Sequence, residues 1–186
     1  GKKFKVAEGE GAFYGPKIEV HINDSQGRDW QLGTTQVDLF MLPEQFDLSY
    51  IDETGQKQRP WAIHRAIFGS FERFIGIMLE HFNGALPFWL SPVQVRVLTV
   101  NDKIENYAKT VVEELKNKNI RTEMDFRNES IGKKIREGEM QKIPFLFVIG
   151  EKEEKDKTVA IRERGKGDGG SINIDKFVEK ISSHTR

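Results

Sequence analysis

The sequence predicts an α+β fold for the first half of the chain and an α/β fold for the second half. Residues 17–40 have the pattern of two strands joined by a turn, and a helical pattern follows from residue 70, which favours an antiparallel sheet with a helix. From residue 93 onward strands and helices alternate, as in an α/β layer. Between the halves, NGALPFWLSP (83–92) is rich in glycine and proline, which predicts one domain over residues 1–90 and another over 91–186.

Composition and charge exclude several classes of protein. The chain has 186 residues, no cysteine, and 29 basic against 29 acidic side chains. It therefore contains neither a disulfide framework nor a thiolate zinc site of its own. No apolar run approaches the roughly 18 residues of a membrane span, so we expect a soluble, cytoplasmic protein with no membrane partner. Residues 1–92 hold more acidic than basic side chains and residues 93–186 the reverse, which permits nucleic-acid contact in the second half without requiring it.

The elements of the first half follow from hydrophobic periodicity. Residues 17–24 alternate apolar and polar side chains and predict a half-buried strand, and residues 30–40 predict its hairpin partner. A loop-rich passage extends to about residue 58, and PWAIHRAI predicts a short strand. Residues 70–82 predict a helix that is largely buried. Its apolar face comprises Phe71, Phe74, Ile75, Met78, Leu79 and Phe82.

The second half repeats a different pattern. Strands are predicted over 93–100, 120–126, 144–150 and 158–164, and helices over 102–118, 130–142 and about 173–181. The charged segment EKEEKDK (151–157) and the glycine-rich GKGDGG (165–170) read as a loop and a flexible turn, since the latter lacks the spacing of a phosphate-binding loop. We expect the two halves to fold around separate cores.

Polar side chains of the first half form one candidate site. Gln31 and Gln36 are five positions apart, so a regular strand places them on opposite faces. If both serve one site, a bulge near Gly33 must change the phase, and glycine in a strand is where a bulge is expected. The alternative is two glutamines that face solvent. A Gly-Pro turn would hold Tyr14 and Lys17 at the mouth of a strand, where the lysine either neutralises an anion or is an ordinary surface residue.

A second candidate lies at the start of the helix near residue 70. Ser70 and Arg73 share the N-terminal end of one helix face, where backbone amides favour an anion and arginine suits phosphate or a flat ring. His64 precedes them on a strand. A lone histidine is more often structural than a metal ligand, and no other ligand lies at a suitable spacing. In the second half, Asn128 and the basic residues that follow it suit either an unstacked RNA base or a solvated basic face.

Several segments, in this order and at these spacings, resemble the threonyl-tRNA synthetases. In the first half they are EGAFYGPKIEV, WQLGTTQVD, IHRAIFGSFERFIGIMLE and PFWLSPVQV. In the second half RNESIGKKIRE, IPFLFVIGEKE and VAIRERG resemble the C-terminal anticodon-binding domain of that family. The resemblance covers practically the whole chain. It implies part of an antiparallel class II catalytic sheet with the motif 3 helix, followed by an α/β anticodon-binding domain with a mixed sheet.

The resemblance also implies a role for individual residues. Gly69 to Arg73 match the G-x-x-x-R of motif 3, so Arg73 is expected to hold ATP and Ser70 to line the same pocket. Positions that match the threonine, adenylate and tRNA-acceptor site are Tyr14, Lys17, Gln31 and Gln36, with Gln31 also expected to contact ATP. His64 matches one of three ligands of a zinc that binds the amino group and hydroxyl of threonine. Positions that match anticodon contacts are Asn128, Lys142, Glu153 and Arg162, although many members of the family have arginine in place of Lys142.

The resemblance implies an activity for a longer enzyme. That enzyme would use ATP with magnesium to form threonyl-adenylate, transfer threonine to its tRNA, and work as a homodimer. The other two zinc ligands, the other class II motifs and the editing domain are absent from the sequence, so we expect a C-terminal fragment that is inactive alone but binds the anticodon region. The alternative is a non-catalytic, synthetase-like module that binds RNA or protein. The ATP-pocket residues argue against it, because a pure binding module has no need of them.

Overall fold

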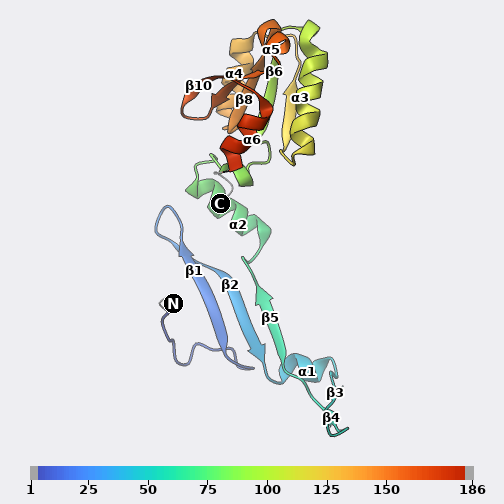
Figure 1. Ribbon diagram of the computed structural model, residues 1–186. Helices are drawn as coiled ribbons and strands as arrows, with labels where there is room; N and C mark the ends of the chain where they lie inside the picture. The colour runs from blue at the N-terminus through green and yellow to red at the C-terminus, as the bar shows by residue number, and fades with distance from the viewer. Residues whose placement is uncertain (1–3, 183–186) are drawn as a thin grey trace. The chain divides into compact units, whose positions relative to one another are not determined.

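The computed structural model describes residues 4–182, and the chain divides into two compact units, Gly1–His81 and Phe82–Arg186 (Figure 1). We call them the first and second units. Across residues 4–182 no helix has the length and apolar character that a membrane span requires.

The first unit is built on a three-stranded antiparallel sheet. Its strands are β1 (Lys17–Asn23), β2 (Asp29–Asp38) and β5 (Ala62–Ala66), in the order β1-β2-β5. The helix α2 (Phe71–His81) follows β5 and confirms the predicted hairpin-and-helix pattern. The passage expected to be loop contains a short helix and a two-stranded ladder. These elements are α1 (Met41–Gln45), β3 (Tyr50–Ile51) and β4 (Lys57–Gln58).

A β-bulge interrupts the pairing of β1 with β2. Val20 pairs with Gly33 but His21 pairs with Gln31, so Leu32 is an extra residue in β2. A Cβ on Gly33 would lie 3.0 Å from the carbonyl oxygen of Ile67, which explains why glycine stands at this close approach. The bulge that a shared site for Gln31 and Gln36 would require is present, and it changes the phase of β2 between Gln31 and the rest of the strand.

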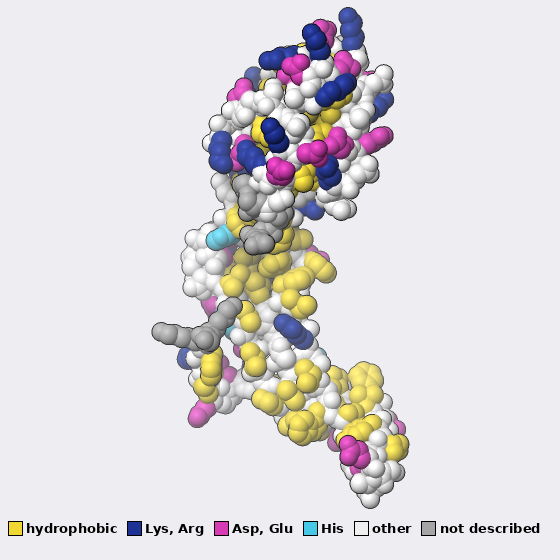
Figure 2. Space-filling model, in the orientation of Figure 1, with side chains coloured by type: hydrophobic (Ala, Val, Ile, Leu, Met, Phe, Trp, Pro, Cys, Tyr) yellow, Lys and Arg dark blue, Asp and Glu magenta, His cyan; other side chains and the backbone are white. Residues whose placement is uncertain are grey.

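The apolar faces of β1 and α2 are exposed, which contradicts the predicted half-buried strand and largely buried helix. Ile18 is 71 % exposed and Phe71 is 67 % exposed, whereas Ile77 is the buried apolar residue of α2. Figure 2 shows apolar side chains gathered over this part of the chain. The periodicity was interpreted correctly as amphipathic. However, the elements of residues 4–81 leave most of these faces uncovered, and this unit has no hydrophobic core cluster of its own among the described residues.

The second unit contains a mixed five-stranded sheet in the order β10-β9-β8-β6-β7. Strand β6 pairs in parallel with β7 and β8, and β8, β9 and β10 pair antiparallel. The strands are β6 (Val95–Thr99), β7 (Thr122–Asp125), β8 (Phe145–Ile149), β9 (Val159–Glu163) and β10 (Gly167–Ile172). The helices are η1 (Phe88–Leu90), η2 (Asp102–Ile104), α3 (Glu105–Asn117), α4 (Ile131–Met140), α5 (Glu151–Asp156) and α6 (Ile174–Ser182).

Helices pack on both faces of this sheet. Helices α3 and α6 cover one face, where Val97, Phe147 and Phe177 are fully buried in the larger core cluster. Helix α4 covers part of the other face, where Leu98 and Leu146 form a smaller cluster. The arrangement is visible in Figure 1, with α3 and α4 on opposite sides of the strands. The predicted α/β domain with its own core is therefore present in this unit.

Two predictions for the second unit were wrong. Residues 151–156 form α5 and are not a loop, because the carboxylate of Glu153 accepts a hydrogen bond from the backbone N–H of Gly150 at 2.9 Å and acidic residues suit a helix N-terminus. Residues 167–172 form the edge strand β10 and are not part of a flexible turn. The glycines fit there because the pairing with β9 shifts register between Asp168 and Ser171, and Gly170 has a φ of 75°.

Candidate functional site

The sheet of the first unit gathers polar side chains on one face. Gln36 pairs with Lys17 on one side and with His64 on the other, so these three side chains form a row across the strands. The bulge turns Gln31 toward the same face, where its side-chain amide donates to the Thr34 hydroxyl at 2.8 Å. Gln31 and Gln36 can therefore share one site, because the bulge that this requires is present in β2.

Short contacts organise this polar face into two groups. The Tyr14 hydroxyl donates to Gln36 Oε1 at 2.7 Å, and the Tyr14 ring stacks on His64 with centroids 5.7 Å apart. Glu19 Oε1 accepts hydrogen bonds from Lys17 Nζ at 2.8 Å and from Gln31 Nε2 at 2.6 Å. The hydrogen bond from Lys17 holds the pKa of Glu19 below its usual range. Sequence reasoning missed Glu19, although alternation along β1 places it on the same face as Lys17.

His64 presents an unsatisfied nitrogen to this region. Its Nε2 is buried without a hydrogen-bond partner and lies 3.6 Å from Asp38 Oδ2. That carboxylate is occupied, because it accepts hydrogen bonds from the backbone N–H groups of Phe40, Met41 and Leu42. Among residues 4–182 no three His, Cys, Asp or Glu side chains are grouped as metal ligands. A free nitrogen suits a metal ligand, but the described residues do not form a zinc site by themselves.

The start of α2 has the geometry of a capped helix terminus. Gly69 has a φ of 72°, which favours glycine, and the Ser70 hydroxyl accepts a hydrogen bond from the backbone N–H of Arg73 at 3.3 Å. The exposed Arg73 guanidinium lies over the Trp30 ring, 5.5 Å from its centroid. Trp30 in turn donates from its indole N–H to Asp24 Oδ2 at 2.8 Å. Sequence reasoning missed Trp30, because only the fold brings β2 beside α2.

In the second unit the four candidate anticodon residues lie at two ends of the sheet. Asn128 and Glu153 follow the carboxyl ends of β7 and β8; Asn128 is exposed, and Glu153 caps α5. Lys142 precedes the amino end of β8 and donates from Nζ to the carbonyl of Asn83. Arg162 on β9 pairs with Leu146, near the amino end of β8.

Arg162 has unused hydrogen-bonding capacity. Its Nη2 lies 3.6 Å from Glu139 Oε1, beyond hydrogen-bonding distance, and its Nε is buried without a partner. Arg162 shares its sheet face with Leu146 on the side that α4 covers only in part. A guanidinium with free donors on a partly open face can bind a base or a phosphate.

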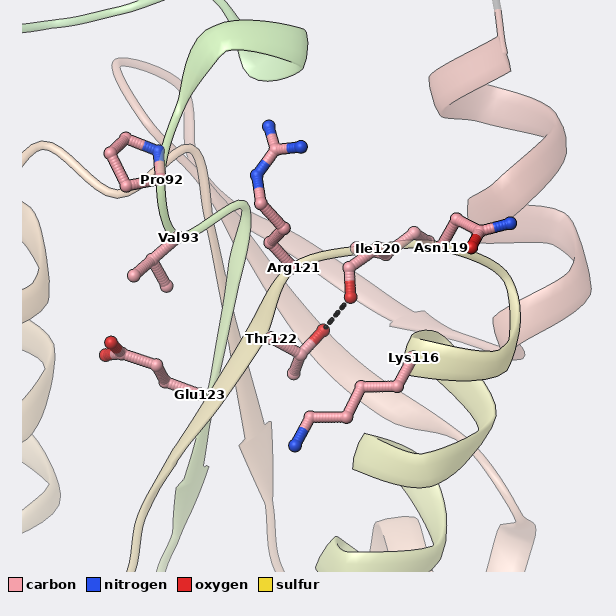
Figure 3. Close-up of a pocket in the computed structure, with 8 residues that line it drawn as sticks. All are labelled: Pro92, Val93, Lys116, Asn119, Ile120, Arg121, Thr122 and Glu123. Atoms are coloured by element: carbon pink, nitrogen blue, oxygen red, sulfur yellow. Dashed lines mark hydrogen bonds between the residues drawn. The ribbon is translucent and has the colours of Figure 1, made fainter.

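The second unit also has a shallow pocket (Figure 3). It is lined by residues 92–93, 116 and 119–123, at the amino ends of β6 and β7. The Arg121 side chain at its rim is occupied by the carbonyls of Ser91 and Trp89, at 2.9 and 2.7 Å. Thr122 donates its hydroxyl to the carbonyl of Ile120 at 3.0 Å. The pocket therefore reflects strand-end packing and contains none of the predicted site residues.

Comparison with known proteins defines the class. Residues 2–82 match the class II tRNA synthetase core domain (G, H, P, S and T), and residues 94–184 match the anticodon binding domain. Together the two matches cover nearly the whole chain. The fold of each unit and these matches define the chain as part of a class II aminoacyl-tRNA synthetase.

Within that class the chain belongs to the threonine–tRNA ligase family. It is 54 % identical over 186 residues to the threonine–tRNA ligase of Carboxydothermus hydrogenoformans, and 56 % identical over 178 residues to that of Desulforamulus reducens. The alignments cover 100 % and 96 % of this chain but 29 % and 28 % of those relatives. The RNA binding domain of a threonyl-tRNA synthetase from Cryptosporidium parvum Iowa II superposes with a TM-score of 0.80 at 43 % identity, over 95 % of this chain and 44 % of that one.

Proposed function

We propose that the whole protein to which this chain belongs joins threonine to its tRNA, and that the second unit binds the anticodon stem-loop. The observation that carries the proposal is an alignment to a threonine–tRNA ligase that spans the full 186 residues of this chain at 54 % identity. The synthetase-like, non-catalytic alternative has no comparable support. The homodimer and the cytoplasmic location remain predictions for the whole protein.

In the first unit we assign the polar face to threonine, adenylate and the tRNA acceptor end. Threonine would be activated when its carboxylate oxygen attacks the α-phosphorus of magnesium-bound ATP, which forms threonyl-adenylate and releases pyrophosphate. Arg73, with Ser70 beside it, would hold the adenine and the terminal phosphate through a planar cation. Lys17 and Gln31, both tied to Glu19, would orient the adenylate.

We assign Tyr14 and Gln36 to the amino acid, together with His64. The unsatisfied Nε2 of His64 supports a role as one zinc ligand, with the other ligands supplied by parts of the protein outside the described residues. When bound, such a zinc would accept the amino group and hydroxyl of threonine and so exclude valine. The Tyr14 ring stacked on His64 would fix the imidazole plane.

In the second unit we assign anticodon contacts to Asn128, Lys142, Glu153 and Arg162. An amide, a carboxylate and two cations offer the donors and acceptors that unstacked bases and their phosphates require. Their spread over the sheet fits an anticodon whose bases contact separate points of the domain.

RNA binding by the 186-residue chain tests this assignment. We expect weak, salt-dependent binding of a stem-loop with the threonine anticodon, and weaker binding of the same stem with a substituted anticodon. Arg162→Gln is expected to reduce affinity for the cognate loop by about 1–3 kcal/mol and to relax discrimination. Lys109→Gln on α3 removes the same charge and serves as the matched control, with a small and uniform effect. Equal affinity of the wild-type chain for both loops would refute the anticodon assignment.

Pyrophosphate exchange tests whether this chain can activate threonine without the rest of the protein. Since the described residues supply only part of the proposed catalytic site, the chain alone is expected to give no threonine-dependent exchange between pyrophosphate and ATP. Exchange above background by the purified chain, abolished by Arg73→Ala, would show that these residues suffice for activation.

A further inference from the structure

Lys134 is a buried lysine that none of the assigned roles uses. It lies on α4, 2 % exposed, and its Nζ donates to the carbonyl oxygens of Thr99 at 2.9 Å and Asp125 at 3.2 Å. The Thr99 hydroxyl lies 3.5 Å away. Lysine is almost never buried unless its ammonium is paired, so these acceptors account for its position.

The acceptors mark the carboxyl ends of two neighbouring strands. Thr99 is the last residue of β6 and Asp125 the last of β7, and the two strands run parallel. The helix after β6 covers one face of the sheet and the helix after β7 covers the other. In open α/β sheets this divergence leaves a crevice in which ligands bind. In this unit the Lys134 ammonium occupies that position and bridges the two strand ends.

The segment that follows β7 is held from both sides. The Arg127 guanidinium bonds Asp125 through Nε at 2.9 Å and Nη2 at 2.6 Å, and Nη2 also bonds Glu137 on α4 at 2.6 Å. Glu129 accepts a hydrogen bond from Lys133 Nζ on α4 at 2.6 Å. Both chain neighbours of Asn128 are thus tied to α4. The Asn128 side chain itself is exposed and makes no hydrogen bond within the described part of the chain.

We propose that Lys134 is a positioning residue for RNA recognition: it fixes the ends of β6 and β7 so that residues 126–130 present Asn128 in a single orientation to an unstacked base. This inference rests on the proposed anticodon function. A recognition loop that is ordered before binding loses less conformational entropy on binding, and this gain applies only to the base that the loop fits. Lys134 contacts no RNA in this proposal, since its ammonium is enclosed by protein.

Substitution of Lys134 by methionine tests the proposal, because methionine has a similar length and no donors. Lys134→Met is expected to weaken binding of the threonine-anticodon stem-loop about tenfold, the effect of leaving a side chain and its loop to be ordered on binding. Binding of the substituted stem-loop should stay unchanged. Amide hydrogen exchange should rise in residues 126–130 and not in β10. A merely structural role would lower stability without changing the ratio of the two affinities.

The absence of cysteine permits a rescue experiment. Lys134→Cys can be alkylated in denaturant with 2-bromoethylamine, which restores an ammonium at nearly the length of lysine, or with 1-iodopropane, which gives an uncharged side chain of similar shape. After refolding, the aminoethylated protein should regain discrimination between the two stem-loops and the propylated protein should not. Equal discrimination by both would overturn the proposal.

A second variant covers the case in which Lys134 variants do not fold. Glu137→Gln on the surface of α4 removes the partner of Arg127 and one negative charge. Electrostatics alone predict tighter RNA binding, whereas the proposal predicts weaker binding of the cognate loop. Ile181→Val on α6 serves as the control for general destabilisation. If the wild-type chain binds the two stem-loops equally, the proposed anticodon function is refuted. Amide hydrogen exchange in residues 126–130 still decides whether Lys134 orders this segment. Unchanged exchange in a folded Lys134→Met chain would reject that role.

Discussion

The two units of the chain differ in what stabilises them. Among the described residues, the second unit contains nearly all of the buried apolar side chains, and the first unit contributes Leu32, Pro43 and Ile77. The large exposed apolar side chains show the opposite distribution, since most of them lie in the first unit. The first unit is instead held by strand pairing and by polar ties such as Asp24 to Arg28 and Trp30.

This difference shows that similar hydrophobic patterns lead to different outcomes. Helix α2 and helix α6 are both amphipathic, but α6 buries Ile174, Phe177 and Ile181 on a sheet face, whereas Ile77 is the only buried residue of α2 among those described. Burial of apolar area is the main source of folding free energy. We therefore expect the second unit to fold on its own, and the first unit to require apolar surface from outside residues 4–81 to cover its exposed faces.

Separating the units should give the largest effect. Residues 82–186 alone are expected to unfold cooperatively with urea, with a free energy of unfolding in the ordinary range of about 5–15 kcal/mol. Residues 1–81 alone are expected to show no cooperative transition, because little apolar area is buried there. Circular dichroism and near-ultraviolet spectra of the two pieces measure this. Cooperative unfolding of residues 1–81 would contradict the comparison.

A matched pair of phenylalanine substitutions, one in each unit, tests the same difference in burial at single side chains. Phe177 is fully buried and packs edge-on against Phe145 and Phe147, with ring centroids 5.0 and 4.7 Å apart. Phe177→Ala is expected to destabilise the second unit by about 3–5 kcal/mol. Phe71→Ala removes the same side chain from an exposed site of α2 and should change stability by less than about 0.5 kcal/mol. Urea denaturation of both variants provides the measurement, and similar losses would contradict the burial pattern.

The acid response of the first unit should report its polar ties. Burial acts to raise the pKa of Asp24, but hydrogen bonds from Trp30 and Arg28 outweigh burial and hold the pKa well below its usual range. A lowered pKa stabilises the folded form fully above the ordinary value of 3.8. This contribution declines as the pH falls below 3.8 and is lost once the pH has passed through the lower, folded value, where the carboxylate of the folded form takes up its proton. Trp30 fluorescence, with Trp61 and Trp89 replaced by phenylalanine, should therefore stay unchanged through pH 3.8. A transition centred there would indicate an Asp24 carboxylate without these bonds.

The smallest expected effect concerns an exposed pair on the same hairpin. The hydrogen bond to Asp29, at 2.7 Å, raises the pKa of His21 above 6.5. The protonated ring supports the pair below that value, and the support is lost as the pH rises through the raised pKa. NMR titration should show a raised pKa that falls toward 6.5 in Asp29→Asn. No change on this substitution would mean that the pair does not form in solution.

Much of the fold could be predicted from the sequence, because its signals are local. The hairpin of β1 and β2, the α/β alternation and the Ser130 cap of α4 all follow from periodicity and capping residues. Helix α5 and strand β10 could not be predicted in this way. Glu153 reaches back to Gly150 only in the folded loop, and the glycines of β10 form a strand because β9 offers them a paired edge.

The candidate site was predictable where residues share a strand. Alternation and one glycine were enough to state the condition, a bulge near Gly33, under which Gln31 and Gln36 would face the same side. Trp30 under Arg73 and the Lys134 bridge depend on elements distant in sequence that meet only in the folded chain. The burial of β1 and α2 was overestimated for a related reason: periodicity identifies an apolar face, but it does not identify what covers that face.

The cap of α5 has a consequence for RNA contact. Glu153 gives Oε2 to the backbone N–H of Gly150 and leaves Oε1 without a hydrogen bond in the described structure. The side chain therefore loses its rotamer freedom when the domain folds and not when RNA arrives. A base amino group that donates to Oε1 would therefore find an acceptor whose orientation the helix has already fixed. A base that presents an oxygen at this point would be repelled by the same fixed carboxylate.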